Sequence, residues 1–229
     1  MTFTPPNAGR ARRGLLTDYG GVLTTSVFES FHAFERAEGL ERGASVRLLR
    51  DDARAGRLLA GMETGATAAA AFEAEIGAML GVSPGGLLSR MFAATRPQPE
   101  MIDAVRAARR AGVRTALLSN SWGEGGYPEA SFAQLFDAVV ISGRVGLRKP
   151  DPAIYRLAAD RLGLEPGDCV FVDDLPGNLQ PAERLGMAVI LHREPAGTLA
   201  ALGRLLGLDL TPGRAGAGAG TRADPDQPR

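Results

Sequence analysis

The feature that most constrains the fold of this chain is an alternation of short apolar runs with amphipathic segments. Five runs have the length and the nearly continuous apolar character of buried strands: residues 14–19, 113–120, 137–142, 168–174 and 187–192. Segments with helical periodicity lie between and after these runs, at 99–111, 128–135, 151–163, 176–186 and 195–207. Because parallel strands need helical crossovers and are buried on both faces, the pattern predicts an α/β protein with a doubly wound parallel sheet.

Residues 25–95 interrupt this alternation and contain no convincing strand. Their periodicity predicts helices at 44–60, 65–80 and 84–94, after a first helix that carries Val27, Phe28, Phe31 and Phe34 at helical spacing. A phenylalanine stripe of this kind is typical of a packed helix face rather than of a cofactor site. The sequence therefore predicts an all-helical domain inserted after the first strand.

The predicted domain boundaries follow from these two patterns. Residues 13–24 and 96–210 form the α/β core, and residues 25–95 form the helical insertion. Residues 1–12 and the Gly/Ala/Pro-rich segment 211–229 are expected to be disordered tails, because they contain few large apolar side chains.

Composition excludes several classes of partner. Acidic and basic residues balance at 26 each, and no basic patch interleaved with aromatic residues is visible, so a nucleic-acid partner is not expected. No apolar run approaches the roughly 20 residues of a membrane span, and the N-terminus lacks the apolar segment of a secretory signal. The single cysteine rules out an intrachain disulfide and fits a reducing cytoplasm, the expected location. Nothing in the sequence indicates an oligomeric state.

Polar side chains stand where the predicted strands end. Asp18 follows the first strand and Asp173 with Asp174 ends the fourth, while Ser119 and Asn120 end the second. Ligands of open parallel sheets bind at this edge. A strand-end acid taken alone is commonly a helix cap, but the set as a whole suits phosphoryl chemistry, since carboxylates bind Mg²⁺ and can act as nucleophiles.

A lysine completes this set. The chain has 25 arginines but one lysine, Lys149, which follows the third strand in the segment SGRVGLRKP. Arginine and lysine differ in shape and hydration, so an ammonium is either required at this position or present by chance. Together with the Ser119 hydroxyl it could hold phosphate oxygens, and the paired glycines Gly20 and Gly21 would allow a tight turn beside them.

Four segments in this order, DYGGVLT, LLSNS, GLRKPDPAIY and FVDDLPGN, resemble the four motifs of the haloacid dehalogenase-like (HAD) hydrolases. The resemblance covers about residues 14–193, with the helical insertion where the family carries its cap, and is greatest to the branch that includes the phosphatase-like N-terminal domain of soluble epoxide hydrolases.

The resemblance implies roles for individual residues. Asp18 would be the nucleophile, Ser119 would bind the phosphoryl group, and Lys149 would balance the charge between them. Asn120 would shape the substrate-binding loop beside Ser119. The Mg²⁺ ligands would be Asp18, Asp174 and the backbone carbonyl of residue 20, with Asp173 in support. The implied substrate is a small phosphorylated metabolite.

Gly20 departs from the family pattern, which usually has a second aspartate two residues after the nucleophile. That aspartate protonates the leaving alcohol, and such general acid–base help is worth about 10²–10⁴-fold. Three alternatives remain. The acid comes from elsewhere; the substrates have good leaving groups; or the protein binds a ligand without turnover. A metal-independent haloacid dehalogenase fits less well, because the acids at 173–174 indicate a cation.

Four further side chains carry open alternatives. Trp122 and Tyr127 lie in the loop after the second strand, where they either face a substrate or pack the loop. His192 ends the last strand, where it either touches the strand-end site or lies apart from it. Arg148 either pairs with nearby acids or faces solvent.

Overall fold

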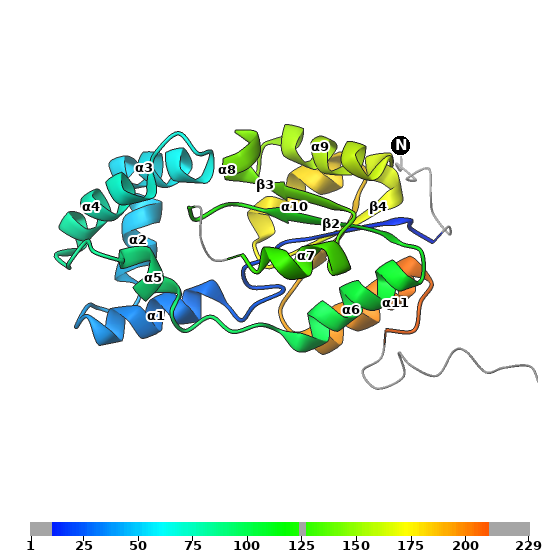
Figure 1. The fold of residues 1–229 in the computed structure, drawn as a ribbon, viewed down its shortest axis with the longest axis horizontal. Coiled ribbons are helices and arrows are strands. Elements are labelled where there is room, and N and C mark those ends of the chain that lie inside the picture. Colours follow the sequence, from blue (N-terminus) through cyan, green and yellow to red (C-terminus); the bar gives the residue numbers. More distant parts are fainter. Residues whose placement is uncertain (1–10, 124–126, 211–229) are drawn as a thin grey trace, which may run out of the picture.

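The computed structural model describes residues 11–123 and 127–210. Its centre is a five-stranded parallel sheet in the order β3-β2-β1-β4-β5 (Figure 1). The strands are β1 (Gly14–Thr17), β2 (Arg114–Ser119), β3 (Ala138–Ile141), β4 (Cys169–Asp173) and β5 (Ala188–Leu191). The predicted doubly wound sheet is confirmed, with each strand two residues shorter than its apolar run. Of the predicted tails 1–12 and 211–229, residues 1–10 and 211–229 lie outside the described residues.

Helices cover both faces of the sheet (Figure 1). They are α6 (Pro99–Arg110), α7 (Glu129–Leu135), α8 (Ser142–Val145), α9 (Pro152–Leu162), α10 (Pro176–Arg184) and α11 (Pro195–Leu206), with a 3₁₀ turn at Pro166–Asp168. Successive residues of one strand point to opposite faces. Leu15 packs with α6, α7 and α11 in one core, and Leu16 packs with α9 and α10 in the other. The near-continuous apolar strands are explained by this two-sided burial.

The ends of α9 show how local sequence sets element boundaries. The Asp151 side chain accepts a hydrogen bond of 2.8 Å from the Ala153 N–H, and Pro152 occupies the first turn. Gly163, with φ +66°, ends the helix. The capping aspartate, the first-turn proline and the closing glycine thus set the bounds of α9 at Pro152–Leu162.

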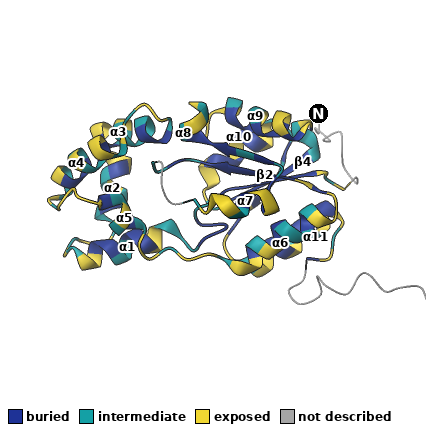
Figure 2. Cartoon of the chain, viewed as in Figure 1, coloured by how far each residue is buried: buried dark blue, intermediate teal, exposed yellow. Residues whose placement is uncertain are grey.

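Residues 27–92 form a separate set of helices with its own apolar core. These are α1 (Val27–Ala37), α2 (Ala44–Asp51), α3 (Ala53–Glu63), α4 (Ala69–Leu80) and α5 (Leu87–Phe92). Phe31, Phe34, Phe72 and Ile76 lie in this core, and Figure 2 shows buried faces turned toward one another there. The phenylalanine stripe is therefore a packed face, although Phe28 is exposed.

One helix expected in this region is two helices. The predicted helix 44–60 is interrupted at Asp52, whose backbone is extended and whose carboxylate accepts hydrogen bonds from the Arg54 and Ala55 N–H groups at 2.8 and 2.9 Å. Aspartate competes with helix continuation by capping a new helix in this way. The predicted helix 65–80 begins only at Ala69, after a turn in which Gly65 has φ +79°. Within the described residues, no helix combines the length and apolar character needed to span a membrane.

Candidate functional site

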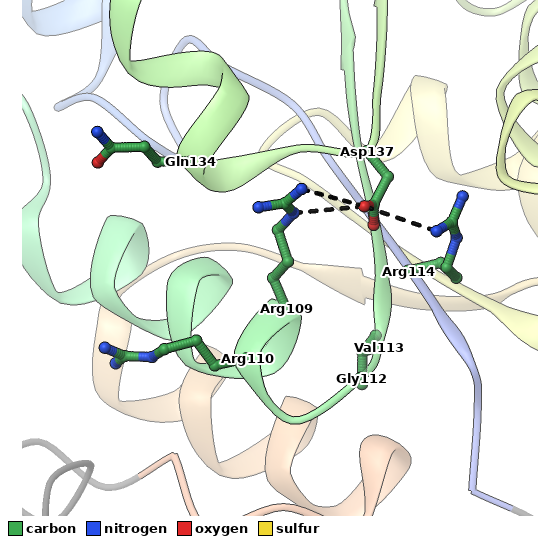
Figure 3. A pocket seen from close by; sticks show the side chains of 7 residues that line it. All are labelled: Arg109, Arg110, Gly112, Val113, Arg114, Gln134 and Asp137. Atoms are coloured by element: carbon green, nitrogen blue, oxygen red, sulfur yellow. Dashed lines mark hydrogen bonds and ion pairs between the residues drawn. The ribbon is translucent and has the colours of Figure 1, made fainter.

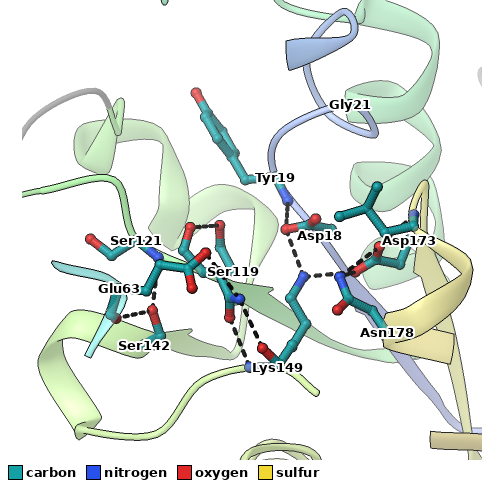
Figure 4. A network of polar contacts seen from close by, with 12 residues as sticks. Asp18, Tyr19, Gly21, Glu63, Ser119, Ser121, Ser142, Lys149, Asp173 and Asn178 are labelled. Atoms are coloured by element: carbon teal, nitrogen blue, oxygen red, sulfur yellow. Dashed lines mark hydrogen bonds and ion pairs between the residues drawn. The ribbon is translucent and has the colours of Figure 1, made fainter. Parts of the chain in front are cut away.

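The carboxyl ends of the central strands bring the predicted polar residues together (Figure 4). Asp18 directly follows β1, Ser119 is the last residue of β2, and Asp173 is the last residue of β4. All three are buried. Lys149 comes from the loop between α8 and α9 and extends its side chain between the two aspartates. Parallel topology explains the gathering, since it places these strand ends at one edge of the sheet.

Lys149 joins the two carboxylates. Its Nζ lies 2.9 Å from Asp18 Oδ1 and 2.7 Å from Asp173 Oδ2, and the side chain is only 1% exposed. Burial by itself lowers the pKa of Lys149, but the two carboxylates raise it overall, so the ammonium stays charged. The single lysine of the chain is thus a buried cation between two acids, a position for which a compact ammonium is suited.

Asp173 is held by three donors. Asn178 Nδ2 lies 3.0 Å from both carboxylate oxygens, and the Leu175 N–H donates to Oδ1 at 2.8 Å. Lys149 supplies the third contact. These contacts hold the Asp173 carboxylate against the Lys149 ammonium, with Asn178 as a neutral donor to it.

Asp18, Asp173 and Asp174 form an acidic cluster. Each contributes one carboxylate oxygen, and these three oxygens lie within 4.8 Å of one another. Burial raises the pKa of Asp18 to about 7, against the opposing effect of Lys149. Burial, followed by the charge of Asp173, raises the pKa of Asp174 to about 6. Hard carboxylate oxygens at this spacing fit a divalent cation, whose charge would stabilise the ionised acids.

The two glycines after Asp18 differ in what they require. Gly21 has φ +76°, and a Cβ built there would lie 2.2 Å from Asp174 Oδ2. Position 21 therefore needs glycine both for its backbone conformation and for the approach of Asp174. A Cβ at Gly20 would lie 2.9 Å from Val27 Cγ2 of α1. The space into which a side chain at position 20 would extend is thus occupied by a valine from the helical region.

Ser119 and Asn120 make different contacts. The Ser119 Oγ lies 2.9 Å from the Tyr127 hydroxyl. The Asn120 side chain faces the backbone of Lys149: its Oδ1 accepts from the Lys149 N–H at 2.8 Å, and its Nδ2 donates to the Lys149 carbonyl at 3.1 Å. Asn120 therefore fixes the loop that carries the lysine.

A buried glutamate at the end of α3 was not found by sequence reasoning. Glu63 Oε2 lies 2.6 Å from Arg148 Nε, and Oε1 accepts a hydrogen bond of 3.4 Å from Asn120. The Ser142 hydroxyl donates to the Glu63 carbonyl. Burial raises the pKa of Glu63, with Arg148 opposing. No motif marks this residue, because its partners come together only through the docking of the helical region. The ion-paired alternative for Arg148 is the observed one.

The remaining candidates lie elsewhere. Trp122 packs in edge-to-face contacts against Phe31, Phe72 and Phe92, so it joins the loop after β2 to the helical region. His192 is buried, and its Nδ1 lies 2.8 Å from the Thr198 hydroxyl.

A cavity of about 260 Å³ lies at the amino ends of β2 and β3, opposite the acidic cluster (Figure 3). Arg109 and Arg114 lie 3.3 and 3.7 Å from Asp137 Oδ1 there. The carboxylate already pairs with both guanidinium groups, and Arg109 also sits in the last turn of α6, where a cation is favoured. This cavity therefore has a structural explanation.

Comparison with known proteins identifies the family. The model of the haloacid dehalogenase-like hydrolases matches residues 13–186, most of the described chain. The chain belongs to this family of hydrolases. It is 38% identical to the bifunctional epoxide hydrolase 2 of Sus scrofa over 117 residues, 48% of this chain and 21% of that protein. The match therefore spans about a fifth of that relative's length.

One further sequence relative and one solved structure are similar to this chain. It is 32% identical to the glyceraldehyde 3-phosphate phosphatase of Methanopyrus kandleri over 108 residues, 44% of this chain and 46% of that one. A HAD family enzyme of Bacteroides thetaiotaomicron, solved in complex with magnesium and inorganic phosphate, superposes with a TM-score of 0.59 at 20% identity. The superposition covers 80% of this chain and 94% of that one and shows the common fold.

Proposed function

We propose that this HAD-like hydrolase is a Mg²⁺-dependent phosphatase of a small phosphomonoester and that Asp18 forms an aspartyl-phosphate intermediate. The observation that carries the proposal is that Asp18 contacts a buried ammonium and has a carboxylate oxygen of Asp174 within 4.8 Å. In this arrangement Asp18 would act as the nucleophile, Lys149 would supply a positive charge beside it, and Asp174 would share a bound cation with it. The phosphatase relative supports the same reaction class.

The contacts of Asp18 indicate which oxygen reacts. Oδ1 receives Lys149 Nζ at 2.9 Å and the Tyr19 N–H at 2.7 Å, which leaves Oδ2 to attack phosphorus. The new bond joins Oδ2 to phosphorus, and the bond from phosphorus to the alcohol oxygen breaks. Water then attacks the same phosphorus, releasing inorganic phosphate and restoring the carboxylate. Ser119 would donate to a phosphoryl oxygen and Lys149 would offset its charge.

Asp18 and Asp174 supply hard oxygen ligands, and the carbonyl of residue 20 follows Asp18 closely enough in sequence to join them. A bound Mg²⁺ would neutralise charge on the phosphoryl oxygens. Asp173, engaged by Lys149 and Asn178, would act by holding the lysine. The close approach of Asp174 to Gly21 supports the assignment of Asp174, rather than Asp173, as the cation ligand. Any larger residue at position 21 would displace the Asp174 carboxylate from beside Asp18.

Gly20 and Val27 indicate the substrate class. No side chain at position 20 can protonate the leaving alcohol, and Val27 occupies the adjoining space. Substrates whose leaving groups need little protonation, such as acyl phosphates or anomeric sugar phosphates, would suit this site best. Residues 25–95 would act as a cap that restricts the substrate to a small metabolite. This is supported by the contact of Glu63 with Arg148 of the core and by the packing of Trp122 of the core on Phe31 of the helical region.

The test is phosphate release from a panel of aryl, acyl, anomeric and alkyl phosphates, with and without Mg²⁺, for the wild type and for Asp18→Asn. We expect Mg²⁺-dependent turnover of the first three classes, reduced to background in the variant. Equal turnover of alkyl phosphates would refute the leaving-group restriction but not the phosphatase. Turnover retained by Asp18→Asn would refute the nucleophile.

A second candidate is a phosphate-binding protein that retained the fold and cation site without turnover. Val27 lies where a side chain at position 20 would begin, so no acid at that position can protonate a leaving group, and this favours a protein without turnover. Saturable binding of inorganic phosphate, with no release from any member of the panel, would select this function over the first.

A further inference from the structure

The Tyr127 hydroxyl contacts the Ser119 Oγ at 2.9 Å. Tyr127 lies outside the four motif segments, in the loop between β2 and α7, and reaches back to the end of β2. Its ring packs against Tyr19, with centroids 5.0 Å apart, and edge-to-face against Phe132 at 6.1 Å. These rings fix the phenol beside the residue that follows Asp18, so its hydroxyl has a defined position at the strand-end site.

The direction of this hydrogen bond follows from the chemistry of the two groups. A phenol is a stronger acid than an alcohol, so it is the better donor, and the alcohol is the better acceptor. Burial raises the pKa of Tyr127 to about 12, which keeps its hydroxyl protonated near neutral pH. The favoured arrangement therefore has Tyr127 donating to Ser119.

This direction has a consequence for Ser119. A serine hydroxyl that accepts from Tyr127 has its own hydrogen available for another acceptor. Its other contact, to the Asn120 carbonyl, is long at 3.5 Å. An anionic oxygen in the site is a stronger acceptor than that carbonyl, and hydrogen bonds in such a chain strengthen one another.

We propose that Tyr127 is a positioning residue that orients the Ser119 hydroxyl to donate to the transferred phosphoryl group. The inference rests on the proposed phosphatase function, since it names a supporting residue of the same site. Tyr127 acts through Ser119 and transfers no proton to the leaving group.

A double-substitution cycle tests the inference. Tyr127→Phe retains the ring and its packing and removes only the hydroxyl. We expect it to lower kcat/KM roughly 3- to 10-fold, the range of one neutral hydrogen bond. Because the effect passes through Ser119, adding Tyr127→Phe to Ser119→Ala should lower kcat/KM no further. The matched control is Ser131→Ala, which removes an exposed hydroxyl that bonds the Pro128 carbonyl, and should leave kcat/KM unchanged.

Leaving-group dependence separates positioning from proton donation. The loss in Tyr127→Phe should be the same across aryl phosphates whose leaving phenols differ in acidity. A loss that grows with the basicity of the leaving phenolate would overturn the inference and make Tyr127 the proton donor. A loss that persists in the Ser119→Ala background would also overturn it, in favour of direct contact with the phosphoryl group. Unchanged kinetics in Tyr127→Phe would overturn it as well.

Binding of tungstate in the presence of Mg²⁺, measured by calorimetry, distinguishes failure of this inference from failure of the proposed function. Suppose that the wild type shows no turnover, that Tyr127→Phe weakens tungstate binding, and that the same substitution has no effect on tungstate binding when Ser119 is already alanine. That result would refute the phosphatase and support the positioning role. Neither turnover nor tungstate binding by the wild type would refute both.

Discussion

Two buried carboxylates of this protein are paired with cations in different surroundings. Asp173 is fully buried, as is its partner Lys149, whereas Glu63 is paired with Arg148, whose side chain is 34% exposed. The first pair lies within the α/β core, and the second joins the helical region to it. Loss of Lys149 leaves two buried carboxylates without a cation, whereas loss of Arg148 leaves one, so the two pairs should respond differently to the loss of their cations.

The largest effect is expected from Lys149→Met. Both Asp18 and Asp173 would lose their buried cation, and breaking a buried pair in this way typically costs about 3–5 kcal/mol of stability. Phosphate release should fall to background, because Asp18, the proposed nucleophile, loses the ammonium that contacts it. Urea unfolding and phosphate release measure the two effects. The matched control is Arg148→Met at the adjacent position, which leaves one buried carboxylate without its cation instead of two and should therefore cost less. Equal destabilisation by the two variants would contradict the comparison.

Gly21→Ala tests the cation side of the strand-end site. The left-handed backbone at φ +76° costs a non-glycine residue about 1–2 kcal/mol. The new methyl group would also displace Asp174, so Mg²⁺ should bind more weakly, as calorimetry would measure. In the control Gly20→Ala, the methyl group meets Val27 instead and leaves Asp174 in place. Mg²⁺ affinity lowered equally in both variants would argue against Asp174 as a ligand.

The sheet and the strand-end residues could be predicted because both follow from regular patterns. Apolar runs separated by helical segments imply parallel strands, and parallel strands bring Asp18, Ser119 and Asp173 to one edge. For the single lysine among 25 arginines, the sequence left a specific requirement and chance as alternatives, and the structure places this lysine between two carboxylates. These inferences need only local sequence and topology.

The contacts between the two regions could not be predicted in the same way. Glu63 meets Arg148 and Asn120 because the helical region docks on the core, and no periodicity encodes that docking. Likewise, Val27 fills the space beside Gly20 from a separate helix. The helix break at Asp52 was missed because a capping carboxylate prevailed over a continuous helical pattern.

The pH dependence of Mg²⁺ binding should follow the acids of the strand-end site. Burial raises the pKa of Asp18 to about 7 and that of Asp174 to about 6, and a cation requires both to be ionised. Apparent affinity should therefore fall as pH decreases from 8 to 5, by up to about tenfold per pH unit for each proton displaced. Calorimetric titration across this range measures the slope, and a flat profile would contradict the assignment.

Stability without the cation should change in the opposite direction. These acids bind protons more tightly in the folded state than in the unfolded state, where their pKa lies near 3.9. The folded protein therefore holds more protons between about pH 4 and 7, and these groups make the cation-free protein more stable as pH falls through that range. Added Mg²⁺ should raise the melting temperature more at pH 8 than at pH 5. In Asp174→Asn, the remaining pH dependence should come from Asp18 alone.

Glu63→Gln should have the smallest effect. An amide keeps a hydrogen bond to Asn120 and loses the charge that pairs with Arg148, and because that arginine is one-third exposed, water can solvate it. We expect a loss of at most about 1 kcal/mol in unfolding free energy and unchanged tungstate affinity, because the phosphoryl-binding residues belong to the core. Proteolysis between residues 63 and 69, followed by gel electrophoresis, should be faster if the ion pair holds the helical region against the core. Unchanged proteolysis would mean that the apolar contacts of Trp122 hold the two regions together without it.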